Sequence, residues 1–130
     1  MRIFKTKWFA RFARHEQILD VGLREAIERA ERGLIDADLG GGLIKQRVAR
    51  QGKGRSGGYR TIIAYRAKKR AVFLSAFAKS DQENIGADEL LSLRATANAW
   101  MNANEADLRR ELESGRIEEV DDGKENEQFG

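Results

Sequence analysis

Hydrophobic and polar positions divide the chain into a helical first part, a strand-rich middle and a helical end. Residues 2–6 alternate as a short strand, and Trp8, Phe9 and Phe12 then recur at the spacing of one helix face. We expect these rings to fill the core, and the alternative is an exposed platform for stacking. The N-terminal section is therefore predicted to be a strand followed by a helix.

A second helix is predicted from Asp20 to about Arg32. Asp20 is a plausible N-cap, and Leu23 and Ile27 line one side of the helix among charged residues. Gly33 follows the last helical position, where a glycine often ends a helix. We interpret this helix as scaffold.

The middle of the chain reads as three strands. Residues 43–50 alternate in polarity, residues 59–66 are rich in aromatic and β-branched side chains, and residues 71–79 are apolar on both faces. The connection at 51–58 holds four glycines and predicts a mobile loop, whereas residues 67–70 suit a short hairpin. Strands joined this closely predict an antiparallel meander.

The first of these strands carries two cations on one face. A period of two places Lys45 and Arg47 together with Leu43 and Ala49. The strand rise separates Lys45 from Arg47 by about 7 Å. The two side chains are therefore expected to reach the same ligand.

Two further helices and a tail are predicted after residue 86. Apolar side chains recur at helical spacing at Leu90, Leu93, Ala97 and Trp100. Asn104 and Asp107 resemble a reciprocal cap at the start of a last helix, which Gly115 would end. We expect one domain over residues 1–117, and the acidic segment 118–130 is expected to be a disordered tail.

The predicted fold class is α+β. A small antiparallel sheet of about four strands would pack against the N-terminal helices, with the C-terminal helices beside it. The chain has no cysteine, no run of apolar residues long enough for a membrane span, and no cleavable leader pattern at its N-terminus. We therefore expect a cytoplasmic protein with no membrane partner.

Charge is distributed very unevenly in a chain whose net charge is only +3. Residues 39–80 contain no Asp or Glu, whereas residues 81–130 are strongly acidic. The unopposed cations of the middle section are Lys45, Arg47, Arg50, Lys53, Arg55, Arg60, Arg66, Lys68, Lys69, Arg70 and Lys79. Such a concentration on a folded module predicts a polyanionic partner.

The residue types in this section limit the chemistry. It contains neither a Walker motif nor a dinucleotide-binding glycine pattern, and it has no carboxylate or imidazole to hold a metal. We expect no cofactor and no metal. His15 is the only histidine, which excludes a nuclease that uses a histidine pair.

A site made only of cations suits RNA cleavage in which the 2′-OH attacks the adjacent phosphodiester. Arginines can stabilise the negative charge of the transition state, and a lysine can act as a base where crowded cations lower its pKa. The alternative is that these cations only bind phosphate.

The segments IKQR, SGGYRTIIAYR and AVFLSAFAKS resemble the RelE/ParE superfamily of type II toxins, and most closely its HigB-like, RelE-type branch. The motif SGGYR spans Ser56–Arg60, and the resemblance covers about residues 1–85. It implies a compact RelE-like fold and a ribosome-dependent mRNA endonuclease, with an antitoxin protein, mRNA and the ribosome as partners.

The resemblance also implies roles for individual residues. Lys45 and Arg47 match the strand cations in base and phosphate roles, Arg60 matches the arginine that stabilises the transition state, and Lys79 matches a cation at the end of the last strand. The expected RNA or phosphate contacts are Arg50, Lys53, Arg55 and Arg66.

The chain departs from the RelE pattern after Lys79. Ser80 stands where RelE has an arginine, and no tyrosine follows Tyr65, so the resemblance assigns no general acid. Two alternative functions follow: a ParE-like inhibitor of DNA gyrase, which shares the fold but needs no catalytic residues, and an RNA-binding module without catalysis.

Overall fold

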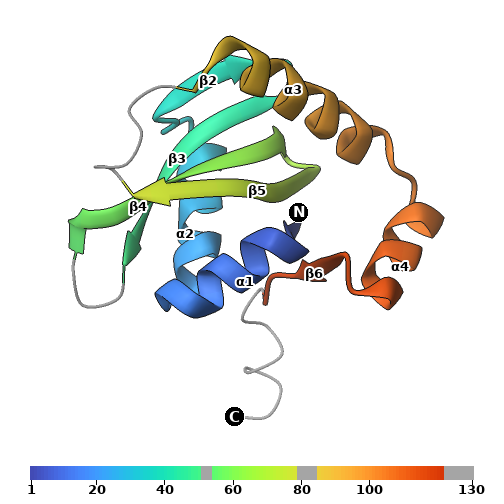
Figure 1. Ribbon diagram of the computed structural model, residues 1–130, viewed down its shortest axis with the longest axis horizontal. Coiled ribbons are helices and arrows are strands. Elements are labelled where there is room, and N and C mark those ends of the chain that lie inside the picture. The colour runs from blue at the N-terminus through green and yellow to red at the C-terminus, as the bar shows by residue number, and fades with distance from the viewer. Residues whose placement is uncertain (51–53, 79–84, 122–130) are drawn as a thin grey trace.

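The protein is a six-stranded sheet with helices on both faces (Figure 1). A computed structural model describes residues 1–50, 54–78 and 85–121. The strands are β1 (Arg2–Thr6), β2 (Ala37–Gly40), β3 (Leu43–Arg50), β4 (Gly54–Arg66), β5 (Arg70–Ala78) and β6 (Ile117–Glu119). The helices are α1 (Lys7–Glu16), α2 (Asp20–Glu31), α3 (Ala87–Asn102) and α4 (Glu105–Ser114).

The sheet has the order β2-β3-β4-β5-β1-β6. Strands β3, β4 and β5 form the predicted antiparallel meander. Strand β1 lies parallel to β5, however, so the sheet is mixed where an antiparallel sheet was expected. Strands β2 and β6, which the hydrophobic pattern did not predict, add short antiparallel pairings next to β3 and β1.

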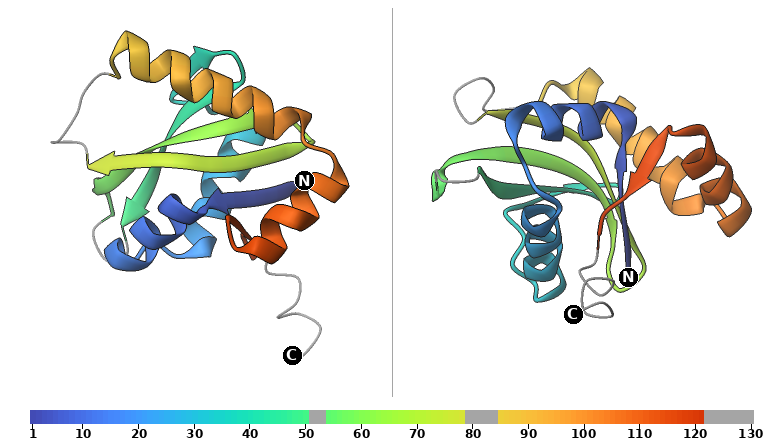
Figure 2. Two further views of the ribbon diagram at one scale, coloured as in Figure 1. Left: turned by 45° about the vertical axis from the view of Figure 1, so that its right-hand side comes forward. Right: turned by 90° about the horizontal axis from the view of Figure 1, so that it is seen from below.

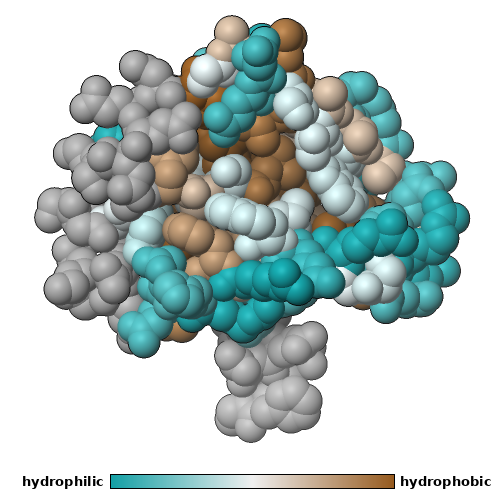
Figure 3. All heavy atoms as spheres, viewed as in Figure 1, coloured by the Kyte–Doolittle hydropathy of each residue, from teal (hydrophilic) through white to brown (hydrophobic). Residues whose placement is uncertain are grey.

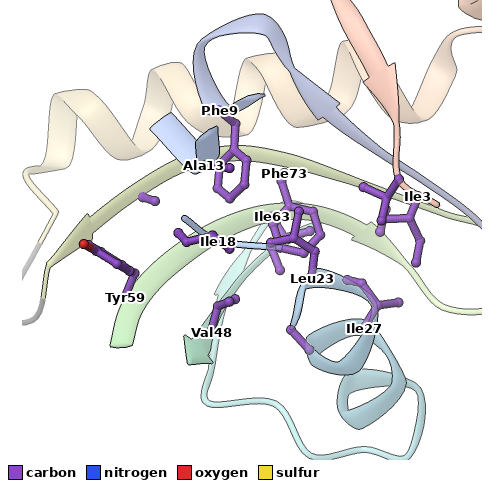
Figure 4. Packing of buried hydrophobic residues seen from close by; sticks show 14 of the residues in the cluster. Ile3, Phe9, Ala13, Ile18, Leu23, Ile27, Val48, Tyr59, Ile63 and Phe73 are labelled. Atoms are coloured by element: carbon purple, nitrogen blue, oxygen red, sulfur yellow. The ribbon is translucent and has the colours of Figure 1, made fainter. Parts of the chain in front are cut away.

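Two apolar cores lie on opposite faces of the sheet. In the first core, Phe9 of α1 and Leu23 of α2 pack against Val48 and Phe73 (Figure 4). In the second core, residues of α3 and α4 pack against the other face. Its sheet members include Leu43, Ile62, Ala64 and Val72, and its helix members include Ala97 and Leu108. Figure 2 shows α2 and α3 on opposite sides of the sheet.

The aromatic residues of α1 divide between core and surface. Phe9 is fully buried and Phe12 is partly buried, as expected for core rings. Trp8 remains 54% exposed and stacks on Phe12 with ring centroids 5.4 Å apart. The core interpretation therefore holds for two of the three rings.

The first residues of the helices confirm one predicted N-cap and correct another. Asn104 and Asp107 form the reciprocal capping box at the start of α4, with hydrogen bonds of 2.8 and 2.9 Å. Asp20 is the first residue of α2 and not its N-cap, which is Leu19. The Asp20 carboxylate instead accepts hydrogen bonds from Lys5 Nζ at 2.6 Å and from the Asp121 amide at 3.0 Å.

Part of the predicted acidic tail belongs to the sheet. Glu118 and Glu119 lie in β6, and Val120 is buried in the first core. Glu119 accepts hydrogen bonds from Arg2, and this interaction raises the pKa of the Arg2 guanidinium. Residues 122–130 lie outside the described residues.

Candidate functional site

Three of the predicted site residues share one face of the sheet. Arg47 of β3 lies directly opposite Arg60 of β4, and Lys45 lies opposite Ile62. Alternation along each strand places all three cations on the same face as Ile62, which belongs to the second core. The structure therefore brings Lys45, Arg47 and Arg60 together on the face that carries α3.

This group of cations has no anionic partner within the described part of the chain. None of the three side chains forms an ion pair there, and all three are partly exposed. Like charges placed directly opposite each other on two strands destabilise a sheet. An anionic ligand between Arg47 and Arg60 would relieve that repulsion, and a phosphate group suits paired guanidinium groups.

On β5, the position next to Arg60 is occupied by an aromatic residue. Phe77 lies directly opposite Arg60 and packs, partly buried, at the border of the second core. Figure 3 shows apolar side chains gathered beside α3 on this side of the molecule, bordered by hydrophilic residues. The sequence marked Phe77 only as part of an apolar strand, because its position beside Arg60 depends on the register between β4 and β5.

The glycine motif before Arg60 is explained by close backbone packing. An added Cβ at Gly58 would lie 2.3 Å from the carbonyl oxygen of Val48. Strand β4 begins at Gly54, so most of the segment predicted as a loop over 51–58 is part of the strand. Gly58 therefore lets β4 approach β3 next to the Arg47–Arg60 pair.

The remaining predicted residues divide into three groups. Lys53 and Lys79 lie outside the described residues. Arg50 is in β3 and Arg55 is in β4. Arg66 lies six positions after Arg60 on β4, which is about 20 Å at the rise of a strand.

Arg66 belongs to a second basic group at the turn between β4 and β5. A cavity of about 310 Å³ is lined by Arg66, Lys68, Lys69, Arg70 and Met101. Arg70 donates to the carbonyl oxygens of Trp100 and Ala103 at 2.6 and 2.8 Å. The structure thus separates Arg47 and Arg60, near the middle of β4, from the basic group around Arg66 at the C-terminal end of this strand.

Tyr65 anchors the same turn from the other face. Its hydroxyl donates to the carboxylate of Glu31, which also accepts from the amide of Lys68 at 3.0 Å. Burial, together with this hydrogen bond, raises the pKa of Tyr65. The turn is therefore held against α2 by Glu31.

Metal-binding clusters and membrane-spanning helices are both absent from the described part of the chain. Within residues 1–50, 54–78 and 85–121, no three or more His, Cys, Asp or Glu side chains are grouped so that they could hold a metal ion. Over the same ranges, no helix has the length and apolarity needed to cross a bilayer.

Fold and site together define an α+β protein with a cation-lined sheet face suited to a polyanion. A family model described as the RelE toxin of the RelE / RelB toxin-antitoxin system matches residues 1–120. The chain therefore belongs to the RelE toxin family. It is a toxin of a toxin–antitoxin system, and its family implies an antitoxin as partner.

Proposed function

We propose that the protein is a ribosome-dependent mRNA endonuclease of the HigB-like branch, which inhibits translation in the cytoplasm by metal-independent cleavage. The observation that carries this proposal is the direct pairing of Arg47 with Arg60 beside Lys45, on one partly exposed face and without a counterion among the described residues. Cations held this close suit a phosphodiester whose negative charge increases in the transition state.

The reaction uses the nucleophile of the RNA itself. The 2′-oxygen bonds to the adjacent phosphorus, and the bond from phosphorus to the 5′-oxygen of the next nucleotide breaks. Lys45 accepts the proton of the 2′-OH, and Arg47 and Arg60 bind the non-bridging phosphate oxygens. Lys79 follows β5 in the chain and is assigned to the same phosphate. The leaving 5′-oxygen takes up a proton, so the products are a cyclic phosphate and a 5′-hydroxyl.

The second basic group suits RNA binding without catalysis. Arg66 and its neighbours lie about 20 Å along β4 from Arg60, too far to contact the same phosphate. We assign Arg66, together with Arg50, Lys53 and Arg55, to contacts with the backbone of mRNA or ribosomal RNA. These contacts would place the message on the catalytic residues.

The test is primer extension on translated mRNA, with purified protein and with ribosomes present or absent. Wild-type protein is expected to produce site-specific breaks only when ribosomes are present. Arg60→Ala should lower cleavage by about 100- to 1000-fold, since it removes a donor that stabilises the transition state. Arg32→Ala, a change at an exposed arginine after α2, is the matched control and should cleave normally.

Three other outcomes would each contradict the proposal. Undiminished cleavage by folded Arg60→Ala would remove Arg60 from the mechanism. Absence of breaks together with inhibited DNA supercoiling would identify a ParE-like gyrase inhibitor. Ribosome binding without any breaks would identify a non-catalytic RNA-binding module.

A further inference from the structure

Arg47 lies on a part of β3 that has no outer neighbour in the described sheet. Strand β2 pairs with β3 only at Leu43, Ile44 and Lys45, so no described strand lies beside the edge of β3 beyond Lys45. The amide and carbonyl of Arg47 both point to this open edge, because their hydrogen-bond partners lie there and not on β4. An edge of this kind normally exposes its backbone groups.

Two charged side chains take the place of the missing strand. The amide of Arg47 donates to Asp36 Oδ2 at 2.7 Å. The carbonyl oxygen of Arg47 accepts a hydrogen bond from the guanidinium of Arg29, which comes from α2. Both hydrogen bonds involve a charged group and are therefore among the stronger ones in proteins. The side chains of Asp36 and Arg29 thus hold both polar backbone groups of Arg47.

Asp36 is exposed, but its position is restricted because its own backbone is attached to the core. Its amide donates to Oε1 of the fully buried Gln46 at 2.8 Å. Nε2 of Gln46 in turn donates to the carbonyl oxygens of Ala26 and Leu34, at 2.9 and 3.1 Å. Gln46, the residue that precedes Arg47, therefore fixes Asp36 relative to α2.

Arg29 loses hydration at its guanidinium group, which a freely solvated surface arginine would keep. Its Nε is buried and has no hydrogen-bond partner among the described residues. A cavity of about 30 Å³ adjoins it, lined by Gly22, Glu25, Arg29, Arg47 and Ala49. The guanidinium thus gives up part of its hydration in order to reach the backbone of Arg47.

We propose that Asp36 and Arg29 are positioning residues, which clamp the backbone of Arg47 so that its guanidinium stays opposite that of Arg60. The inference rests on the proposed function of this face. Repulsion between two facing guanidinium groups would push an unsupported strand edge away from its neighbour. The clamp opposes this movement from the outer edge of β3, and leaves the side chain of Arg47 free to bind phosphate.

The first measurement is the cleavage of ribosome-bound mRNA at saturating and limiting ribosome concentrations. Arg29→Met and Asp36→Ala each remove one half of the clamp. Both should lower the maximal rate by about 10- to 100-fold, because a displacement of about 1 Å at a reacting group has that effect. The ribosome concentration at half-maximal rate should stay within about twofold of the wild type, since binding contacts elsewhere are retained.

Matched controls separate positioning from a change of charge or fold. Arg32→Met and Asp38→Ala remove residues of the same charge close by, and both should cleave at the wild-type rate. Asp36→Asn keeps an oxygen that can accept from the Arg47 amide, so its cleavage rate should recover substantially relative to that of Asp36→Ala. Thermal unfolding identifies any variant that no longer folds.

The second measurement is amide hydrogen exchange at Arg47, which does not depend on any activity. In Asp36→Ala, exchange of this amide should become faster, while exchange at Val48 should stay slow. If the exchange and the cleavage rate are unchanged in folded clamp variants, the inference is wrong. If Arg47→Ala itself cleaves normally, Arg47 has no catalytic role and the clamp has no catalytic purpose, although the protein is still an endonuclease. If the wild-type protein produces no ribosome-dependent breaks, the proposed function fails.

Discussion

At the scale of single residues, Gly58 shows how the backbone constrains the site. A Cβ atom added at Gly58 would lie only 2.3 Å from the carbonyl oxygen of Val48. This obstacle is backbone, so it cannot rotate aside as the end of a flexible side chain would. The second glycine of SGGYR is therefore required by packing, whatever its neighbours do in RNA binding.

Gly58→Ala is expected to destabilise the protein by about 1–3 kcal/mol or more, as overpacking of a dense interior does. Urea denaturation followed by circular dichroism would measure the free energy of unfolding. Gly22→Ala is the matched control, because its added Cβ would lie 3.6 Å from Val48 Cγ1, an ordinary contact. A helical position of this kind should gain about 0.5–1 kcal/mol. Equal stabilities for the two variants would contradict the packing argument.

The sequence placed some side chains at the site and left others unconnected to it. Lys45 and Arg47 could be placed on one face from the sequence, because alternation along a strand depends only on local geometry. Asp36, Arg29 and Phe77 could not be connected to the site. Their relevance depends on register and on contacts between segments that are distant in sequence.

At the scale of elements, β6 changes the role of the C-terminal segment. Three residues of this segment pair with β1, and Ile117 is 1% exposed in the second core. The following Val120 is 4% exposed in the first core. Strand β6, together with Val120 directly after it, thus contributes to both cores and covers the edge of the sheet beside β1.

Ile117→Ala is expected to lower the free energy of unfolding by about 2–5 kcal/mol, the usual cost of truncating a fully buried isoleucine. Leu91→Ala is the control, since Leu91 is 63% exposed on α3. A change within about 0.5 kcal/mol is expected there. Chemical denaturation of both variants would decide whether β6 is part of the cooperative fold, and equal, small effects would show that it is not.

Helices and strands with a clear spacing of apolar residues were predicted from the sequence, and the two strands without such a spacing were missed. The four helices and the meander follow from apolar spacing and from residues at the helix ends. Strands β2 and β6 have the sequences ADLG and IEE, which hold too few apolar residues to indicate a strand. They are strands because a neighbouring edge supplies their hydrogen-bond partners.

At the scale of the whole molecule, the two basic groups on β4 predict steep salt dependence of ribosome binding. Phosphate binding releases counterions, so the logarithm of the binding constant should fall linearly with the logarithm of salt concentration. The double variant Arg66→Gln with Lys69→Gln should reduce this slope by about two, because each cation that binds a phosphate contributes about one. A filter-binding titration over low to moderate salt would measure it.

The control for this titration is a cation on another part of the surface. Arg109→Gln changes an exposed arginine of α4 and should leave the slope close to that of the wild type. A flat titration for the wild-type protein would contradict the electrostatic interpretation. Equal slopes for the double variant and the wild type would restrict RNA binding to the group around Arg60.

The sequence by itself determined the helices, the meander, the basic middle section and the resemblance that pointed to Lys45, Arg47 and Arg60. These features depend on side-chain type and on spacing within one segment. Only the tertiary structure decided that Arg47 faces Arg60, that β1 runs parallel to β5, and that Asp36 and Arg29 hold the open edge of β3. Strand register and edge contacts join distant segments, and the free energy that selects them comes from packing the whole chain.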